Sequence, residues 1–286
     1  MPSTTKEGRT RAGLRRLERH WAVPAPRAAM LLVHGISEHS GRYEHVGDFF
    51  AAGGIDTLSF DLQGHGRSDG RRSHIDTFDT FLDDIEDLLA ERRRLGVPVV
   101  LLGHSLGGLL CSTYAARSRP APDLLVLSAP ALRPEVPWVV QVVTPLLGRV
   151  WPTLRAPNRI DAALLSRDET VTEAYRTDPL RDEWVTARLG AEILAAMDDT
   201  SARLDQITVA TYVLHGADDM VVRPAATEGF EPLANVTRIV HAGLRHECFN
   251  EPEHPEVLAA VLSWIDGRLS SLGVGGAGTP TVVRPD

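Results

Sequence analysis

A serine stands between two glycines in the segment Gly103-His104-Ser105-Leu106-Gly107. The apolar run at residues 97–102 precedes it and a segment of helical period follows, so the serine lies at a strand-to-helix turn. Glycines flank such a sharp turn because a Cβ atom there would collide with neighbouring backbone. The pattern predicts that Ser105 is a nucleophile, and an ordinary glycine-rich loop is the alternative.

A serine hydroxyl attacks only when a base removes its proton, and a carboxylate must orient that base. Two adjacent aspartates, Asp218 and Asp219, follow a late apolar run, and the turn leaves open which of them is the carboxylate. Three histidines come later in the chain. His241 closes the next predicted strand and His254 begins the last helix, whereas His246 lies in the loop between them. We therefore expect His246 to be the general base.

The same chemistry requires two backbone N–H donors for the oxyanion, one after the nucleophile and one after the strand at residues 30–33. Leu106 and Ile36 occupy these positions, and a plain strand-ending turn is the alternative for Ile36. Four other histidines match no metal-ligand spacing, so we expect structural hydrogen bonds from them and no metal or organic cofactor. These histidines are His34, His65, His104 and His215.

Short apolar runs alternate with segments of helical period from residue 28 onward, a pattern typical of parallel βαβ units. The predicted strands are residues 28–33, 55–60, 97–102, 123–127, 208–214 and 237–240. Residues 131–205 interrupt the alternation with helical patches, prolines and no convincing strand, which predicts an inserted helical cap. The expected organisation is a core at residues 14–130 and 206–270, the cap, and disordered tails at residues 1–13 and 271–286.

The cap carries a strongly apolar segment at residues 136–151. It exceeds what one helix face could bury, so either it packs on the second helix of the cap or part of it lines an acyl tunnel and part meets a lipid interface. Prolines and polar residues interrupt the segment, and it is too short for a transmembrane helix.

Composition narrows the possible partners and compartments. Hydrophobic residues make up 43% of the chain, as in a soluble globular protein, and the formal net charge of -8 argues against nucleic acid. The arginines near the N-terminus are expected to form a solvated basic tail. Only Cys111 and Cys248 are present, and no secretory signal is recognised, so we expect a cytoplasmic protein.

Several motifs together resemble the monoacylglycerol lipases, in particular their bacterial branch. The similarity extends over residues 14–268. Its motifs are HGISEHSGRY at 34–43, DLQGHGRS at 61–68, GHSLGG at 103–108, SAP at 128–130, YRTDPL at 175–180 and HECFNEP at 246–252.

The resemblance implies an α/β-hydrolase fold, with a mostly parallel twisted sheet flanked by helices and an inserted helical cap. It implies Asp219 rather than Asp218 as the carboxylate, with Ile36 and Leu106 as the oxyanion donors. It places the glycerol end of the substrate near Glu38, Arg42 and Tyr175. Phe249 stands where the animal enzymes carry a second histidine.

The implied reaction is hydrolysis of a monoacylglycerol to fatty acid and glycerol through an acyl-enzyme, without a cofactor. A lysophospholipase or general carboxylesterase is the alternative, followed by an acyltransferase that passes the acyl group to an alcohol. A non-catalytic binding protein is disfavoured because all three triad residue types are present, and Ser105 stands where epoxide hydrolases and dehalogenases use Asp.

Overall fold

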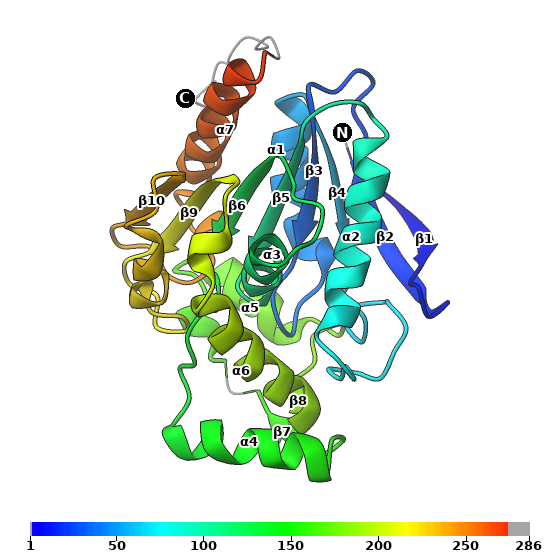
Figure 1. Ribbon diagram of the computed structural model, residues 1–286, viewed down its shortest axis with the longest axis vertical. Coiled ribbons are helices and arrows are strands. Elements are labelled where there is room, and N and C mark those ends of the chain that lie inside the picture. Colours follow the sequence, from blue (N-terminus) through cyan, green and yellow to red (C-terminus); the bar gives the residue numbers. More distant parts are fainter. Residues whose placement is uncertain (1, 159, 274–286) are drawn as a thin grey trace.

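The computed structural model describes residues 2–158 and 160–273, and its centre is an eight-stranded sheet (Figure 1). The strand order is β1-β2-β4-β3-β5-β6-β9-β10. The first two strands are antiparallel additions at one edge, and the other six run parallel. The strands are β1 Thr4–Arg9, β2 Arg15–Trp21, β3 Ala28–Val33, β4 Ile55–Phe60, β5 Val99–His104, β6 Leu124–Ser128, β9 Ala210–Gly216 and β10 Val236–His241.

Helices cover both faces of the sheet, so its central strands are buried throughout, as parallel strands normally are. Helices α2 (Asp79–Arg93) and α3 (Leu106–Ala116) pack on one face. Helices α1 (Glu44–Ala52) and α7 (His254–Ser271) pack on the other (Figure 1). Short 3-10 helices are η1 Ser40–Tyr43, η2 Ala162–Leu164, η3 Leu204–Gln206, η4 Pro224–Phe230 and η5 Cys248–Asn250.

The six predicted strands all exist, two of them with the predicted bounds and four displaced at their ends by one or two residues. The fold is the α/β-hydrolase fold. The prediction of a disordered N-terminal tail is wrong, because residues 4–9 form β1 and pair with β2.

Most arginines of this N-terminal region form ion pairs with carboxylates, although Arg11 and Arg15 remain 47% and 46% exposed, and this corrects the expected free basic tail. Arg16 is buried and donates to Glu18 at 2.9 Å and to Asp84 of α2 at 2.7 Å. Arg11 binds Asp87 of the same helix at 2.7 Å. A strand so rich in charge is stable here because α2 supplies carboxylates opposite it.

The segment between β6 and β9 is the cap. It holds α4 Trp138–Val150, α5 Glu169–Thr177 and α6 Ala187–Ser201. It also holds a two-stranded antiparallel sheet, β7 Arg155–Pro157 and β8 Trp184–Thr186, where no strand was expected. Residues 131–205 remain our proposed limits for the cap.

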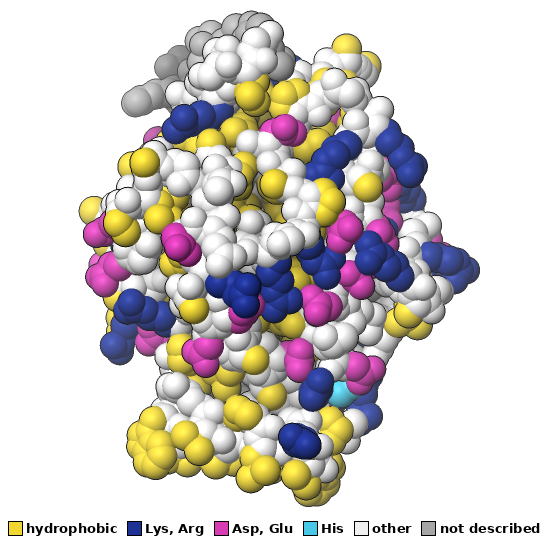
Figure 2. Space-filling view, viewed as in Figure 1, with side chains coloured by type: hydrophobic (Ala, Val, Ile, Leu, Met, Phe, Trp, Pro, Cys, Tyr) yellow, Lys and Arg dark blue, Asp and Glu magenta, His cyan; other side chains and the backbone are white. Residues whose placement is uncertain are grey.

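Helix α4 packs on α6 through small residues. A Cβ atom on Gly148 would lie 2.7 Å from the Cβ of Ala191, and one on Gly190 would lie 3.1 Å from Thr144. Most of the large apolar side chains of α4 are left exposed rather than packed on the second helix: Trp138 is 72% exposed and Val142 64%. Figure 2 shows this hydrophobic surface at the end of the molecule formed by α4.

The last helix, α7, continues to Ser271. The remainder of the predicted C-terminal tail, residues 274–286, lies outside the described residues. Among the helices described, none combines the length and the apolar character needed to cross a membrane.

Candidate active site

Ser105 occupies a sharp turn between β5 and α3. Its backbone has φ +53° and ψ −115°, a left-handed conformation that is strained for a residue with a side chain. Both flanking glycines are sterically required: a Cβ on Gly103 would lie 2.3 Å from the carbonyl oxygen of Gly107, and one on Gly107 would lie 2.1 Å from that of Val33. This is the turn that the glycine spacing predicts.

Asp219 and His246 are brought together from loops that follow β9 and β10. The Nδ1 atom of His246 lies 2.7 Å from Oδ2 of Asp219, and both side chains are buried. Asp218 is exposed, so the structure separates two aspartates that the turn sequence could not distinguish. Of the three histidine candidates, His246 is the one hydrogen-bonded to Asp219.

The carboxylate of Asp219 accepts several further hydrogen bonds. Its Oδ1 accepts from the backbone N–H groups of Val221 and Val222 at 2.8 and 2.9 Å, and Nε2 of His215 lies 3.1 Å from Oδ2. Burial opposes ionisation of Asp219, but His246 and these donors outweigh it and hold its pKa well below the usual value. Burial also lowers the pKa of His246, but the charge of Asp219 prevails and raises it.

The sequence had predicted only a structural role for His215. Its Nε2–H is shared between Asp219 and the carbonyl oxygen of Val222, so it helps to fix the carboxylate beside His246. The His-Gly pair at the end of β9 was the feature of the sequence that could have indicated this role of His215.

Ser105 and His246 line one small polar hollow of about 10 Å³, room for about one water molecule. Glu38, Arg42 and Tyr175, the three residues expected near a glycerol group, line it too. Residues that share this hollow with them are Gly35, Ile36, His104, Ile160, Leu165 and Glu247.

Glu247 is a member of this polar cluster that the sequence did not single out. Arg42 donates to Glu247 at 2.7 and 2.8 Å and to Glu38 at 2.8 Å, and its guanidinium lies 4.9 Å from the ring centre of Tyr175. Burial disfavours the charge of Glu247, but Arg42 outweighs burial and lowers its pKa to about 2. Burial raises the pKa of Tyr175 to about 12, so its hydroxyl stays protonated.

The two candidate oxyanion donors flank Ser105. Leu106 is the first residue of α3, so its N–H has no acceptor within the helix. Ile36 lies in the loop after β3, where a Cβ on the neighbouring Gly35 would be 3.2 Å from the Cβ of Ser105. The main chain of this loop therefore passes close to the serine.

Ser105 also lines a second cavity, of about 380 Å³. Both Ile36 and Leu106 line it, and most of its other walls are apolar side chains of the cap and of the loop after Asp219. These are Ala131, Val136, Ile160, Leu164, Ile193, Met197, Met220, Val221 and Val222. Ser105 thus stands between a polar hollow and an apolar cavity.

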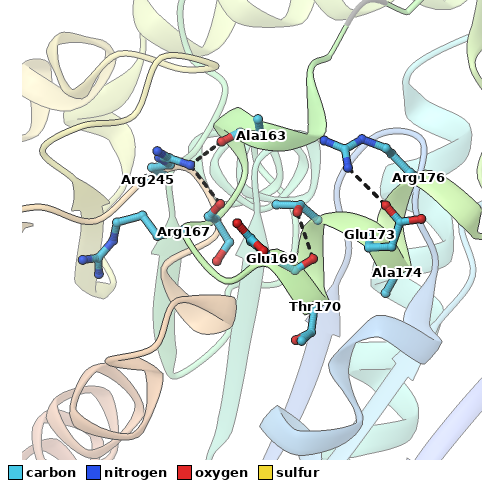
Figure 3. Close-up of a pocket in the computed structure, with 10 residues that line it drawn as sticks. Ala163, Arg167, Glu169, Thr170, Glu173, Ala174, Arg176 and Arg245 are labelled. Atoms are coloured by element: carbon cyan, nitrogen blue, oxygen red, sulfur yellow. Dashed lines mark hydrogen bonds and ion pairs between the residues drawn. The ribbon is translucent and has the colours of Figure 1, made fainter.

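A larger hollow, of about 750 Å³, lies on the outer surface of η2 and α5 (Figure 3). Its walls are mainly charged and hydroxyl-bearing side chains, and neither Ser105 nor His246 lines it. Although it is the larger hollow, it is therefore not the site of the reaction. No cluster of three or more potential metal ligands occurs among the residues that the structure describes.

Comparisons with known proteins identify the family. The family model described as "Serine aminopeptidase, S33" matches residues 24–253. A monoacylglycerol lipase of Mycolicibacterium smegmatis is 34% identical over 252 residues, 85% of this chain and 90% of that protein. The phospholipase YtpA of Bacillus subtilis is 28% identical, over 86% of this chain and 98% of that protein.

Solved structures extend the similarity to three dimensions. The crystal structure of a monoacylglycerol lipase from Paleococcus ferrophilus has a TM-score of 0.81 and 31% identity, and the match covers 90% of this chain and 98% of that one. Since a family model spans most of the sequence and these relatives match nearly end to end, this carboxylic ester hydrolase belongs to the S33 family of α/β-hydrolases, in the branch of the monoacylglycerol lipases.

Proposed function

We propose that the protein hydrolyses monoacylglycerols to fatty acid and glycerol, with Ser105 as nucleophile, His246 as general base and Asp219 as the orienting carboxylate. The observation that carries this proposal is the shared hollow of Ser105 and His246, with His246 bound to Asp219 at 2.7 Å. Because Nδ1–H of His246 donates to Asp219, Nε2 is left unprotonated and able to accept a proton.

In the first half of the reaction, Nε2 of His246 takes the proton of the Ser105 hydroxyl as Oγ attacks the ester carbonyl carbon. The N–H groups of Ile36 and Leu106 stabilise the oxyanion. When the intermediate collapses, the alcohol oxygen leaves with the proton from His246, and the acyl group stays on Ser105. Water then attacks the acyl-enzyme with His246 again as base, and the fatty acid is released.

The two hollows beside Ser105 support a monoacylglycerol rather than a phospholipid. The apolar cavity suits an acyl chain, whereas Glu38, Arg42 and Tyr175 offer polar groups to the hydroxyls of glycerol. The hollow that they line holds about one water molecule, so the proposal requires it to widen when glycerol binds. Arg42 is already neutralised by two carboxylates, Glu38 and Glu247. A phosphate headgroup would therefore meet no free positive charge from Arg42, which makes the lysophospholipase alternative less favourable.

Hydrolysis rates for a panel of monoacylglycerols, lysophospholipids and short nitrophenyl esters test the substrate class. We expect the monoacylglycerols to have the highest kcat/KM. Adding glycerol should not convert the reaction to acyl transfer. Ser105→Ala should remove both esterase activity and labelling by a fluorophosphonate probe while the protein stays folded. Persistent labelling of that variant would exclude Ser105 as the nucleophile.

We further propose that the outward face of α4 contacts a lipid interface and collects substrate there. The exposed apolar residues of α4 are Trp138, Val139, Val140, Val142, Val143, Leu146 and Val150, between 40% and 73% exposed. A contiguous apolar surface of this kind is typical of a membrane or protein contact site. A lipid interface is the occupant that fits a substrate with a long acyl chain.

A further inference from the structure

The loop that carries His246 is fastened to the start of the cap helix α5. We call this contact the clasp, formed by residues 163–168 on the cap side and 245–253 on the loop side. Arg245 reaches across it and donates to the carbonyl oxygens of Ala163 and Ser166, as Figure 3 shows from the outer surface. In addition, the Ser166 hydroxyl donates to the carbonyl oxygen of Asn250 at 2.8 Å.

Glu251 lies at the centre of the clasp, with no exposed surface. Its Oε1 accepts from the backbone N–H of Arg245 at 2.6 Å. Its Oε2 accepts from the backbone N–H and the Nε–H of Arg167, at 3.0 and 3.2 Å, and lies 3.4 Å from the Ser166 hydroxyl. One carboxylate thus joins the cap to the catalytic loop by charge-assisted hydrogen bonds.

These bonds hold the main chain on both sides of His246. The N–H of the preceding residue, Arg245, is bound by Glu251. The N–H of the following residue, Glu247, donates to the carbonyl oxygen of Leu165 at 2.8 Å. Leu165 itself lines the hollow of Ser105 and His246, so both anchors of His246 meet the same short cap segment.

We propose that Glu251 is a positioning residue that couples the placement of the cap to the placement of His246. The proposal rests on the proposed role of His246 as general base. It assigns no chemical step to Glu251. The carboxylate acts by keeping the imidazole aligned between Asp219 and Ser105, and a misplacement of about 1 Å in such an arrangement lowers rates by about 100-fold.

Glu251→Gln tests the charge at nearly constant size. Both oxygens of Glu251 accept from N–H donors, so whichever way the amide of Gln turns, its NH₂ group faces a donor and one side of the clasp opens. We expect kcat to fall tenfold or more, with KM changed less than about twofold, on both short and long esters. The rate of fluorophosphonate labelling should fall in parallel, because labelling also needs His246.

Glu253→Gln is the matched control. Glu253 is 47% exposed and binds Arg167 at the surface, so kcat should stay within about twofold of wild type. Arg167→Met is the milder variant should Glu251→Gln fold poorly, because it removes only the side-chain bonds. It should reduce kcat by more than Glu253→Gln does.

A pH profile separates positioning from a loss of stability. The charge of Asp219 raises the pKa of His246, so an imidazole that drifts away from Asp219 should have a lower pKa. The acid limb of kcat/KM should then move to lower pH in Glu251→Gln. The proposal would be overturned if Glu251→Gln and Arg167→Met both kept the wild-type kcat per active site and the wild-type acid limb of kcat/KM. Activity in His246→Ala would instead overturn the proposed function.

Discussion

The two hollows that meet at Ser105 differ in nearly every physical property. One is polar, holds about 10 Å³ and is walled by Arg42 between two buried carboxylates. The other holds about 380 Å³ and is walled mainly by aliphatic side chains and methionines. The contrast corresponds to the two ends of a monoacylglycerol. The acyl chain would match only the apolar cavity, and the glycerol group would match only the polar hollow.

The walls of the two hollows also come from different sources. The polar side is built chiefly from the loop after β3 and the loop of His246, and the cap adds Ile160, Leu165 and Tyr175. Much of the apolar side comes from the cap, including α6 and the segment before α4. Changes in α6 or in the segment before α4 should therefore alter acyl-chain preference more readily than they alter the chemical step, in contrast to changes in the clasp.

The largest effect should come from Asp219, the carboxylate bound to His246. Asp219→Asn should lower kcat on the order of 10⁴-fold, because the imidazole loses its orienting acceptor. The exposed neighbour provides the control, and Asp218→Asn should keep wild-type kcat for every substrate. A large loss in Asp218→Asn with none in Asp219→Asn would reverse the assignment.

Filling the apolar cavity should slow the hydrolysis of long-chain esters only. Ile193 lies on α6 and lines this cavity. If Ile193→Trp excludes about four methylenes at roughly 0.8 kcal/mol each, the loss is about 3 kcal/mol, or roughly 100-fold in kcat/KM for a long-chain monoacylglycerol. Nitrophenyl acetate should be hydrolysed as before.

Ile239→Trp on the edge strand β10 introduces the same bulk at a side chain that is 38% exposed and lines none of the three hollows. It should leave both substrates unaffected. Equal losses for acetate and long chains in Ile193→Trp would mean that the cavity does not hold the acyl chain.

Local patterns in the sequence predicted the turn of Ser105 and the parallel strands, because both depend on neighbouring residues. The pairing of Arg42 with Glu247 joins residues 205 positions apart, and nothing in either segment indicates it. Asp219 was favoured over Asp218 by family resemblance alone, since which aspartate turns inward depends on the backbone of the loop. The structure supplies that geometry.

The errors in the predicted fold have a similar cause. Strand β2 was missed because its buried positions include Arg16 and Glu18, which are satisfied by each other and by Asp84 of α2. Strands β7 and β8 have three residues each, too few for a period to be read. In α4 the apolar pattern was clear, but the small residues that contact α6 were not recognised as the packing face.

The cap also presents an apolar face to solvent, at α4. Val142→Asp should weaken association with phospholipid vesicles by about tenfold, because two methyl groups at roughly 0.8 kcal/mol each are lost from the contact. Co-sedimentation with vesicles measures this. Turnover of vesicle-borne substrate should fall while nitrophenyl acetate turnover stays unchanged. Absence of vesicle binding by the wild type would show that the face has no interfacial role.

The smallest effect should come from one hydroxyl on the polar side. Tyr175 is buried, lines the polar hollow, and keeps its proton because burial raises its pKa to about 12. If its hydroxyl bonds the glycerol group, Tyr175→Phe should cost about 1 kcal/mol, a roughly fivefold loss in kcat/KM for a monoacylglycerol. The methyl ester of the same fatty acid has no glycerol hydroxyls and should be unaffected. Tyr212→Phe, in β9 and away from the hollow, should change neither substrate. A loss shared by both esters would instead mean that Tyr175 only supports Arg42, and recognition of glycerol would then have to come from other groups in the hollow.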